Sequence, residues 1–119
     1  MERLPRGARI HKSSELRRLL AKGKRQRTPS LDVYVADSGA VRSRLGLIVP
    51  KHGQRIVDRN LLKRRLREIG RRETLPALNV RGARKDVLIR ARPPAYAAGF
   101  DTLAREVREA VEELCSDAY

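Results

Sequence analysis

Cationic side chains are concentrated between residues 51 and 72, at a spacing that suits the binding of a polyanion. Seven of the fourteen residues from 59 to 72 are Lys or Arg, whose side chains bind phosphate oxygens. At about 100° per residue, Leu62, Leu66 and Ile69 fall within about 60° of one another. The polar residues of this segment are spread over roughly 140° of the helix beside these three apolar residues. The pattern predicts a helix that docks through its apolar face and presents a cationic face made of Arg59, Asn60, Lys63, Arg64, Arg67 and Arg71.

A solvated charged surface is the alternative interpretation of this helix. Glu68 is its only acidic residue against seven cations, so pairs within the helix cannot neutralise it, and a bound anion is favoured. The preceding loop contains Lys51 and Arg55 and leads into the first turn of the helix, where free backbone N–H groups favour a phosphate.

Catalytic groups are hard to assemble from this sequence. His11 and His52 could form the acid–base pair of a metal-independent ribonuclease, but two histidines in basic loops are more often phosphate contacts or surface residues. No carboxylates occur at the spacing of a two-metal site, and Cys115 with two distant histidines makes no zinc site. We therefore expect no catalytic residues and no bound metal in this chain.

Net charge supports a nucleic-acid partner. The 119 residues suit one domain, spanning 1–119, and their net charge is +14. Residues 1–98 carry +18, whereas residues 99–119 carry −4 and include Glu106, Glu109, Glu112 and Glu113, which we expect to be a solvated helix face. No apolar stretch approaches 18 residues, which disfavours a membrane, and no secretory signal follows Met1. The single Cys115 fits a reducing cytoplasm.

Tyr34 is one of few aromatic residues and leaves its predicted strand on the face opposite Val33 and Val35. Two roles are open for it, a half-buried core residue or a stacking platform for an unpaired base. In the second role, Leu16 and Leu20 could form the apolar wall beside it.

The predicted elements follow the order α-β-β-α-β-α and indicate an α/β sandwich, a small sheet with packed helices. A short helix over residues 15–22, capped by Ser13 or Ser14 and ended by Gly23, precedes a basic loop at 24–29. Strands at 31–36 and 44–49 could pair as a hairpin, and a third strand is predicted at 86–91. Residues 74–85 read as a loop, and a last helix runs from about 101 to 115.

Four blocks of the chain, in order, resemble the protein subunit of bacterial ribonuclease P. The central block is Arg59-Asn60-x-x-Lys63-Arg64-x-x-Arg67-Glu68, and the others cover residues 12–25, 46–51 and 86–93. The third position of the family's Arg-Asn-Arg signature is Leu61 here. On the helical wheel Leu61 lies about 200° from Arg59, away from the basic arc.

The resemblance implies the family's fold, resembling domain 2 of ribosomal protein S5, with a left-handed βαβ crossover where right-handed ones are the rule. It implies a subunit of an endoribonuclease that binds the catalytic RNA and precursor tRNA, needs no other protein, and leaves the active site and its Mg²⁺ to the RNA. The implied RNA contacts are Lys51, Arg55, Arg59, Asn60, Lys63, Arg64 and Arg67. The implied cleft for the 5′ leader of the precursor contains Lys12, Leu16, Leu20, Arg25 and Tyr34.

Two other functions remain open at this point. A structural RNA-binding protein of the ribosomal type would share the charge but would have no role in cleavage. A protein-only ribonuclease would cleave RNA alone and would depend on His52.

Overall fold

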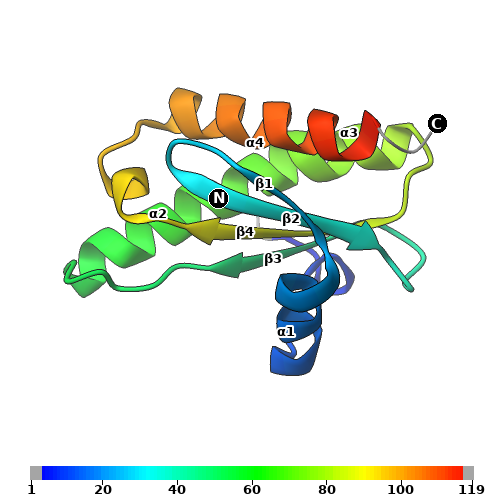
Figure 1. The fold of residues 1–119 in the computed structure, drawn as a ribbon, viewed down its shortest axis with the longest axis horizontal. Coiled ribbons are helices and arrows are strands. Elements are labelled where there is room, and N and C mark those ends of the chain that lie inside the picture. The colour runs from blue at the N-terminus through cyan, green and yellow to red at the C-terminus, as the bar shows by residue number, and fades with distance from the viewer. Residues whose placement is uncertain (1–3, 117–119) are drawn as a thin grey trace.

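The computed structural model describes residues 4–116 and contains a four-stranded mixed sheet with helices on both faces (Figure 1). The strands β1 (Lys24–Arg27), β2 (Leu31–Asp37), β3 (Arg44–Ile48) and β4 (Lys85–Ala91) lie in the order β1-β2-β4-β3. β2 is antiparallel to both β1 and β4, whereas β3 is parallel to β4. This architecture confirms the predicted α/β (α+β) sandwich, a small sheet with packed helices.

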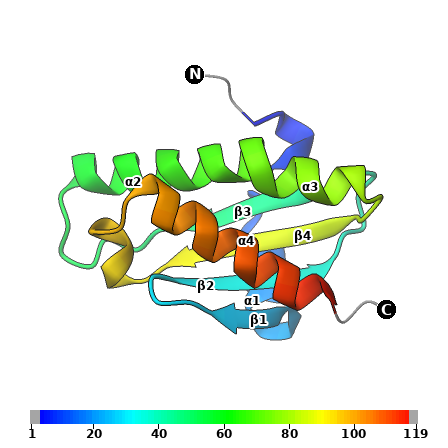
Figure 2. The same ribbon diagram turned by 90° about the horizontal axis from the view of Figure 1, so that it is seen from above.

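Helices cover the two faces of the sheet unequally. Figure 2 shows α2 (Ile56–Ile69) and α4 (Phe100–Ser116) lying across one face, with α1 (Ser13–Lys22) on the other. A π-helical turn, Gly70–Thr74, continues α2 into the short helix α3 (Leu75–Val80). Single 3₁₀ turns, Arg6–Ala8 and Pro93–Tyr96, precede α1 and α4. Within residues 4–116, no helix is long and apolar enough to cross a membrane.

The β3–α2–α3–β4 segment forms the crossover between the two parallel strands. Seen from the helix side, β3 and β4 both run leftward, and the chain passes over the sheet in α2 before entering β4 (Figure 2). With the strands pointing upward, β4 lies to the left of β3, so the crossover is left-handed, as the resemblance implies.

Alternation along β2 divides the apolar residues into two clusters. Val33 and Val35 face α2 and α4 in the main core, together with Leu62, Leu66 and Ile69 of α2. Tyr34 points to the other face, as predicted, and packs with Ile10, Leu19 and Leu88 beneath α1. Leu62, Leu66 and Ile69, which were predicted to dock the basic helix, are therefore buried against the sheet.

Gly46 allows α1 to lie close to the sheet. It occupies the middle of β3 beside Leu88, on the face that α1 covers. A Cβ atom at this position would lie 2.8 Å from Leu16 Cδ2 and 3.3 Å from Ile10 Cβ, closer than such atoms normally approach. The absence of a side chain at Gly46 thus sets the distance between Leu16 and the sheet.

Two strand predictions were wrong. Residues 24–29 were expected to form a loop, but Lys24–Arg27 is the edge strand β1. Its residues are polar and largely exposed, so they lack the apolar alternation that marks a half-buried strand. The expected hairpin between 31–36 and 44–49 is also wrong, because β4 lies between β2 and β3. β4 is apolar on both faces and can pair with two neighbours.

Two helix predictions also need correction. Residues 74–85 were expected to form a loop, yet Leu75–Val80 is the helix α3, with Pro76 in its first turn, where a missing N–H costs nothing. Neither Ser13 nor Ser14 caps α1; its N-cap is Lys12, without a side-chain hydrogen bond. Gly23 does end the helix, and its N–H donates to Leu19 O.

Candidate nucleic-acid interface

The outward face of α2 carries the residues predicted for the cationic face except Arg71, which lies in the π-helical turn and is ion-paired with Glu68. Leu62, Leu66 and Ile69 are at most 2% exposed and fix the rotation of the helix on the sheet. Arg65, beside them, donates from Nη1 to Ala98 O and ties α2 to the segment before α4. The opposite side of the helix is consequently left to the solvent, with Asn60, Arg64 and Arg67 exposed and Arg59 and Lys63 half-buried.

Arg59 is anchored at the edge of this face. Its Nε donates a 2.7 Å hydrogen bond to Val49 O, just beyond the end of β3. Among residues 4–116, its two terminal nitrogens have no acceptor, so one side of the guanidinium is held by the fold while the other remains able to donate. An Arg fixed in this way loses less side-chain entropy when it binds a phosphate.

Lys63 lies one helical turn from both Arg59 and Arg67. Partial burial and the neighbouring cations Arg59 and Arg67 lower the pKa of its ammonium group below the usual value. Like charges one turn apart disfavour one another, and a bound anion relieves that repulsion. The excess positive charge on the outward face of α2 therefore favours the binding of a polyanion.

The loop before α2 is held in a defined conformation. His52 (φ 48°) and Gly53 (φ 75°) are both left-handed, and Gln54 N–H donates to Lys51 O across the turn. The His52 ring meets Tyr96 edge to face at 6.4 Å, and Tyr96 Oη donates to Pro50 O at 2.7 Å. His52 thus has a packing role in the loop that leads into the cationic helix.

The two basic residues predicted in this loop differ in their surroundings. Lys51 is exposed, and among residues 4–116 its ammonium group has no ion-pair partner. Arg55 donates from Nε to Asp58 Oδ2 at 3.0 Å, an exposed pair that raises the pKa of Arg55. An anion approaching Arg55 therefore has to compete with Asp58, whereas Lys51 is available without competition.

The second face of the sheet brings four of the five predicted leader-cleft residues together. Arg25 pairs with Tyr34 across β1 and β2, and Leu16 and Leu20 pack over the same cluster from α1. Lys12 is exposed at the start of that helix. Tyr34 is only 5% exposed, so its ring is covered as it stands, and stacking on a leader base stays a prediction that requires α1 to shift.

The register adds cations that sequence reasoning missed on this face. The row next to Tyr34 runs Arg27–Asp32–Arg90–Ile48 across the four strands, and both of its arginines are exposed. Asp32 Oδ1 is buried without a hydrogen-bond partner among residues 4–116, and Arg25 Nε lies 3.9 Å from it. Residues two apart on a strand lie on the same face of the sheet. If β1 had been recognised as a strand, this alternation along β1 and β4 would have placed Arg27 and Arg90 on the face of Tyr34.

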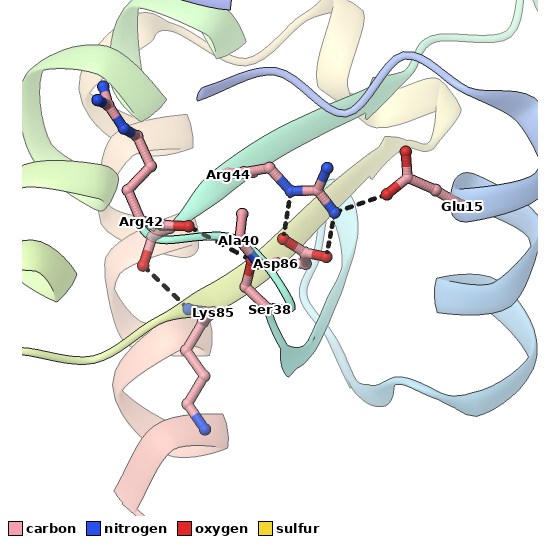
Figure 3. A network of polar contacts seen from close by, with 8 residues as sticks. Glu15, Ser38, Ala40, Arg42, Arg44, Lys85 and Asp86 are labelled. Carbon is pink, nitrogen blue, oxygen red and sulfur yellow. Dashed lines mark hydrogen bonds and ion pairs between the residues drawn. The ribbon is translucent and has the colours of Figure 1, made fainter. Parts of the chain in front are cut away.

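An ion-pair network that was not predicted joins α1 to the sheet. Arg44 donates from Nε and Nη2 to the two carboxylate oxygens of Asp86, at 2.9 and 2.8 Å (Figure 3). Nη2 also reaches Glu15 Oε2 of α1 at 2.7 Å. Hydrogen bonding to Asp86 raises the pKa of Arg44, which stays charged. Nothing local in the sequence marks this network, because its three residues are far apart along the chain.

The expectation for Glu106 was wrong. It is 6% exposed, and its carboxylate accepts hydrogen bonds from Thr28 Oγ1, Ser30 N and Ser30 Oγ. It binds α4 to the turn between β1 and β2. Glu109, Glu112 and Glu113 are exposed as expected, and Cys115 is a buried free thiol. Within residues 4–116, no three His, Cys, Asp or Glu side chains are grouped so as to hold a metal ion.

Fold and surface together define a small basic α+β protein with a left-handed parallel crossover, whose connecting helix presents cations suited to a polyanion. The family model described as Ribonuclease P matches residues 4–115. The chain belongs to the ribonuclease P protein family.

Individual relatives agree with this assignment. The ribonuclease P protein component of Kocuria rhizophila is 35% identical over 108 residues, which cover 91% of this chain and 92% of that protein. The component from Acidothermus cellulolyticus is 35% identical over 105 residues, covering 87% and 84%. The Staphylococcus aureus RNase P protein structure has a TM-score of 0.71 at 25% identity, covering 88% of this chain and 93% of that one. The Thermotoga maritima RNase P protein has the same fold, with a TM-score of 0.65 at 24% identity, covering 92% and 94%.

Proposed function

We propose that this chain binds the catalytic RNA of ribonuclease P through α2 and promotes removal of the 5′ leader from precursor tRNA. The observation that carries this function is the outward face of α2, where Arg59, Lys63 and Arg67 lie one helical turn apart; partial burial, and then the two neighbouring cations, lower the pKa of Lys63. Lys51, Arg55, Asn60 and Arg64 extend the same surface. The relatives named above are ribonuclease P protein components, which supports a role in tRNA processing.

The leader would lie along the sheet face that α1 covers only in part. Lys12 and Arg25 would attract its phosphates, and Leu16, Leu20 and Tyr34 would supply the apolar side of the cleft. The exposed Arg27 and Arg90 extend the cationic part of this face. The two functions use different surfaces, because α2 and α1 lie on opposite faces of the sheet.

The chemical step would belong to the RNA and its Mg²⁺, as the resemblance to the ribonuclease P protein family implies. The contribution of the protein is positional and electrostatic. Cations at the junction of RNA and substrate reduce repulsion between phosphates, so the RNA holds its Mg²⁺ at a lower concentration of that ion. If about five phosphates are contacted, log affinity should fall with log salt at a slope near −4.

One cleavage assay tests this function. Precursor tRNA is incubated at low Mg²⁺ with the protein alone, the cognate ribonuclease P RNA alone, or both. Cleavage only when both are present supports the proposal. Cleavage by the protein alone would indicate a protein-only ribonuclease, and RNA binding without stimulation would indicate a structural RNA-binding protein.

A variant identifies the surface used. Replacing Arg59 and Lys63 together by Ala is expected to weaken RNA binding by more than about 1 kcal/mol, because two phosphate contacts are lost. Circular dichroism should remain that of the parent chain, since neither side chain belongs to the core. Unchanged RNA affinity would place the interface elsewhere on the molecule.

A further inference from the structure

The helix α1 packs on the sheet through a small apolar contact. Of the residues Ser13–Lys22, only Leu19 is fully buried. The buried cluster beneath it contains Ile10, Tyr34 and Leu88. By comparison, α2 docks on the other face through three buried side chains. A contact as small as that of α1 leaves its orientation to be decided by further interactions.

Leu19 separates the two long sides of α1. At about 100° per residue, Leu16 and Leu20 lie on the side of Leu19 that faces the proposed leader cleft. Glu15 and Lys22 lie on its other side, where they line a hollow between α1 and the end of β2. Because a hollow borders this side of the helix, an interaction made here can fix or release the rotation of α1 about Leu19.

Arg44 makes such an interaction. Asp86 of the neighbouring strand holds its guanidinium through two hydrogen bonds, and Nη2 reaches Glu15 Oε2 at 2.7 Å (Figure 3). The Arg44 side chain is 18% exposed and that of Asp86 is 12% exposed, so solvent screens these pairs less than it screens an ion pair on the open surface. Asp86 thus fixes Arg44, and Arg44 fixes the first turn of α1.

The two ends of α1 limit how far the helix can move. Gly23 alone separates it from β1, so its C-terminal end is attached closely to the sheet. Before the helix, Ile10 N–H donates to Leu45 O at 2.9 Å and ties the chain to β3. The Glu15–Arg44 contact therefore acts on a helix whose ends stay in place, and it mainly affects the direction in which the cleft side of α1 points.

We propose that the Glu15–Arg44 ion pair positions α1 for the precursor tRNA, so that the apolar side of the leader cleft is formed before the leader binds. Neither residue contacts the leader; both act through Leu16 and Leu20. A preformed cleft binds more tightly because less conformational freedom is lost on binding. The inference rests on the proposed function, in which the leader lies against this side of α1.

Charge and position predict opposite effects of removing Glu15. Loss of one carboxylate raises the net charge of the protein, which by itself should strengthen binding of an anionic leader. Loss of the contact with Arg44 frees the rotation of α1, which should weaken that binding. The direction of the change in affinity therefore distinguishes the two effects.

The test compares Glu15→Ala with Glu109→Ala, which removes the same charge from an exposed helix position on the opposite face of the sheet. Each full chain is combined with the cognate ribonuclease P RNA, and affinity is measured for a precursor with a long leader and for one with a single-nucleotide leader. For Glu15→Ala, we expect affinity for the long-leader precursor to fall about fivefold, with no change for the short one. Glu109→Ala should leave both affinities within about twofold of the parent values.

Arg44→Lys tests the same contact from the sheet and keeps the net charge. A lysine presents a single ammonium group and cannot hold Asp86 and Glu15 at once as the guanidinium fork does, so we expect a similar loss for the long leader. Glu15→Ala leaves the Arg44–Asp86 pair intact and introduces a residue of high helix propensity, so α1 should stay helical. Circular dichroism of both variants checks that the chain is folded.

Four results would overturn the positioning role. They are a rise in affinity for the long leader in Glu15→Ala, equal losses for the long and short leaders, parental affinity in Arg44→Lys, and a loss of affinity accompanied by a loss of helical signal. If the parent complex prefers the long leader and the Glu15→Ala complex does so equally, the proposed function stands while this inference fails. If the parent complex does not distinguish the two precursors, the proposed leader cleft fails as well.

Discussion

Leu61 directly follows Arg59 and Asn60, at the position where the family's Arg-Asn-Arg signature has a second arginine. It is 41% exposed on α2, outside the arc of basic residues. Val57, one turn earlier, is 71% exposed and continues this apolar strip along the helix. The basic face therefore has a neutral border on the side that approaches the segment before α4.

Replacing Leu61 by Arg should add a phosphate contact at that border. We expect RNA affinity at low salt to rise several-fold, and the slope of log affinity against log salt to steepen by about 0.8. Filter binding across a salt series measures both quantities. Leu61→Gln is the control and should leave the slope unchanged; a Leu61→Arg chain with the slope of its parent would mean that no phosphate lies within reach.

The sequence predicted which side chains of α2 face the sheet and which face the solvent, but it did not predict the hydrogen bonds that hold them in place. Helical spacing is enough to separate Leu62 from Lys63, because the period of the helix decides which residues face the sheet. The hydrogen bond from Arg59 to Val49 O depends on where β3 ends in space, and no local pattern carries that information. The burial of Glu106 escaped prediction for the same reason, since its partners are more than 70 residues away.

Among the elements, α4 is joined to the β1–β2 turn by the buried carboxylate of Glu106. Replacing Glu106 by Ala leaves Thr28 and Ser30 without their acceptor, and we expect a loss of about 2–4 kcal/mol in the free energy of unfolding. Urea denaturation measures this change. Glu109→Ala, on the exposed side of the same helix, should stay within about 0.5 kcal/mol of the parent chain. Similar values for the two variants would contradict a structural role for Glu106.

The junction between α2 and the π turn should make stability depend on pH. A hydrogen bond from Arg71 lowers the pKa of Glu68 below its ordinary value of 4.5. A lowered pKa in the folded state stabilises the protein above pH 4.5, and this contribution is lost as the pH falls through the folded pKa. Glu68→Gln should therefore reduce the melting temperature at pH 7 and have a smaller effect at pH 3.

Thermal denaturation of the Glu68→Gln chain at both pH values checks this expectation. Glu109→Gln, which changes an exposed carboxylate of α4, serves as the control and should show no comparable difference between the two pH values. A reduction in melting temperature that is equal at pH 7 and pH 3 would show that the ionised state of Glu68 is irrelevant to stability.

The strand order was the least predictable part of the fold. Apolar runs located β2, β3 and β4 to within one residue or so, since burial leaves a strong local pattern. The pairing of β4 between β2 and β3 is a long-range choice, and nearest neighbours in sequence suggested a hairpin instead. β1 was not predicted because its residues, Lys24, Arg25, Gln26 and Arg27, are polar and show no apolar alternation. Charges on an exposed edge strand of this kind disfavour its pairing with another chain.

For the whole molecule, the net charge of +14 opposes folding and favours binding. Mobile ions screen repulsion among exposed cations, so raising NaCl from about 20 to 300 mM should increase the melting temperature of the free protein by several degrees. The same change should weaken the complex with RNA. Scanning fluorimetry follows the first effect and filter binding the second; a melting temperature that falls with salt would mean that ion pairs such as Arg44–Asp86 outweigh the repulsion.

The missing side chain at Gly46 sets the distance between α1 and the sheet in the proposed leader cleft. A methyl group there would push against Leu16 and lift α1 from Tyr34, while the α2 surface on the reverse of the sheet would be untouched. A single carbon atom added at position 46 would thus change the space available to a substrate strand in the proposed cleft. A Gly46→Ala chain should bind the ribonuclease P RNA as its parent does and differ only in its preference for precursor over mature tRNA.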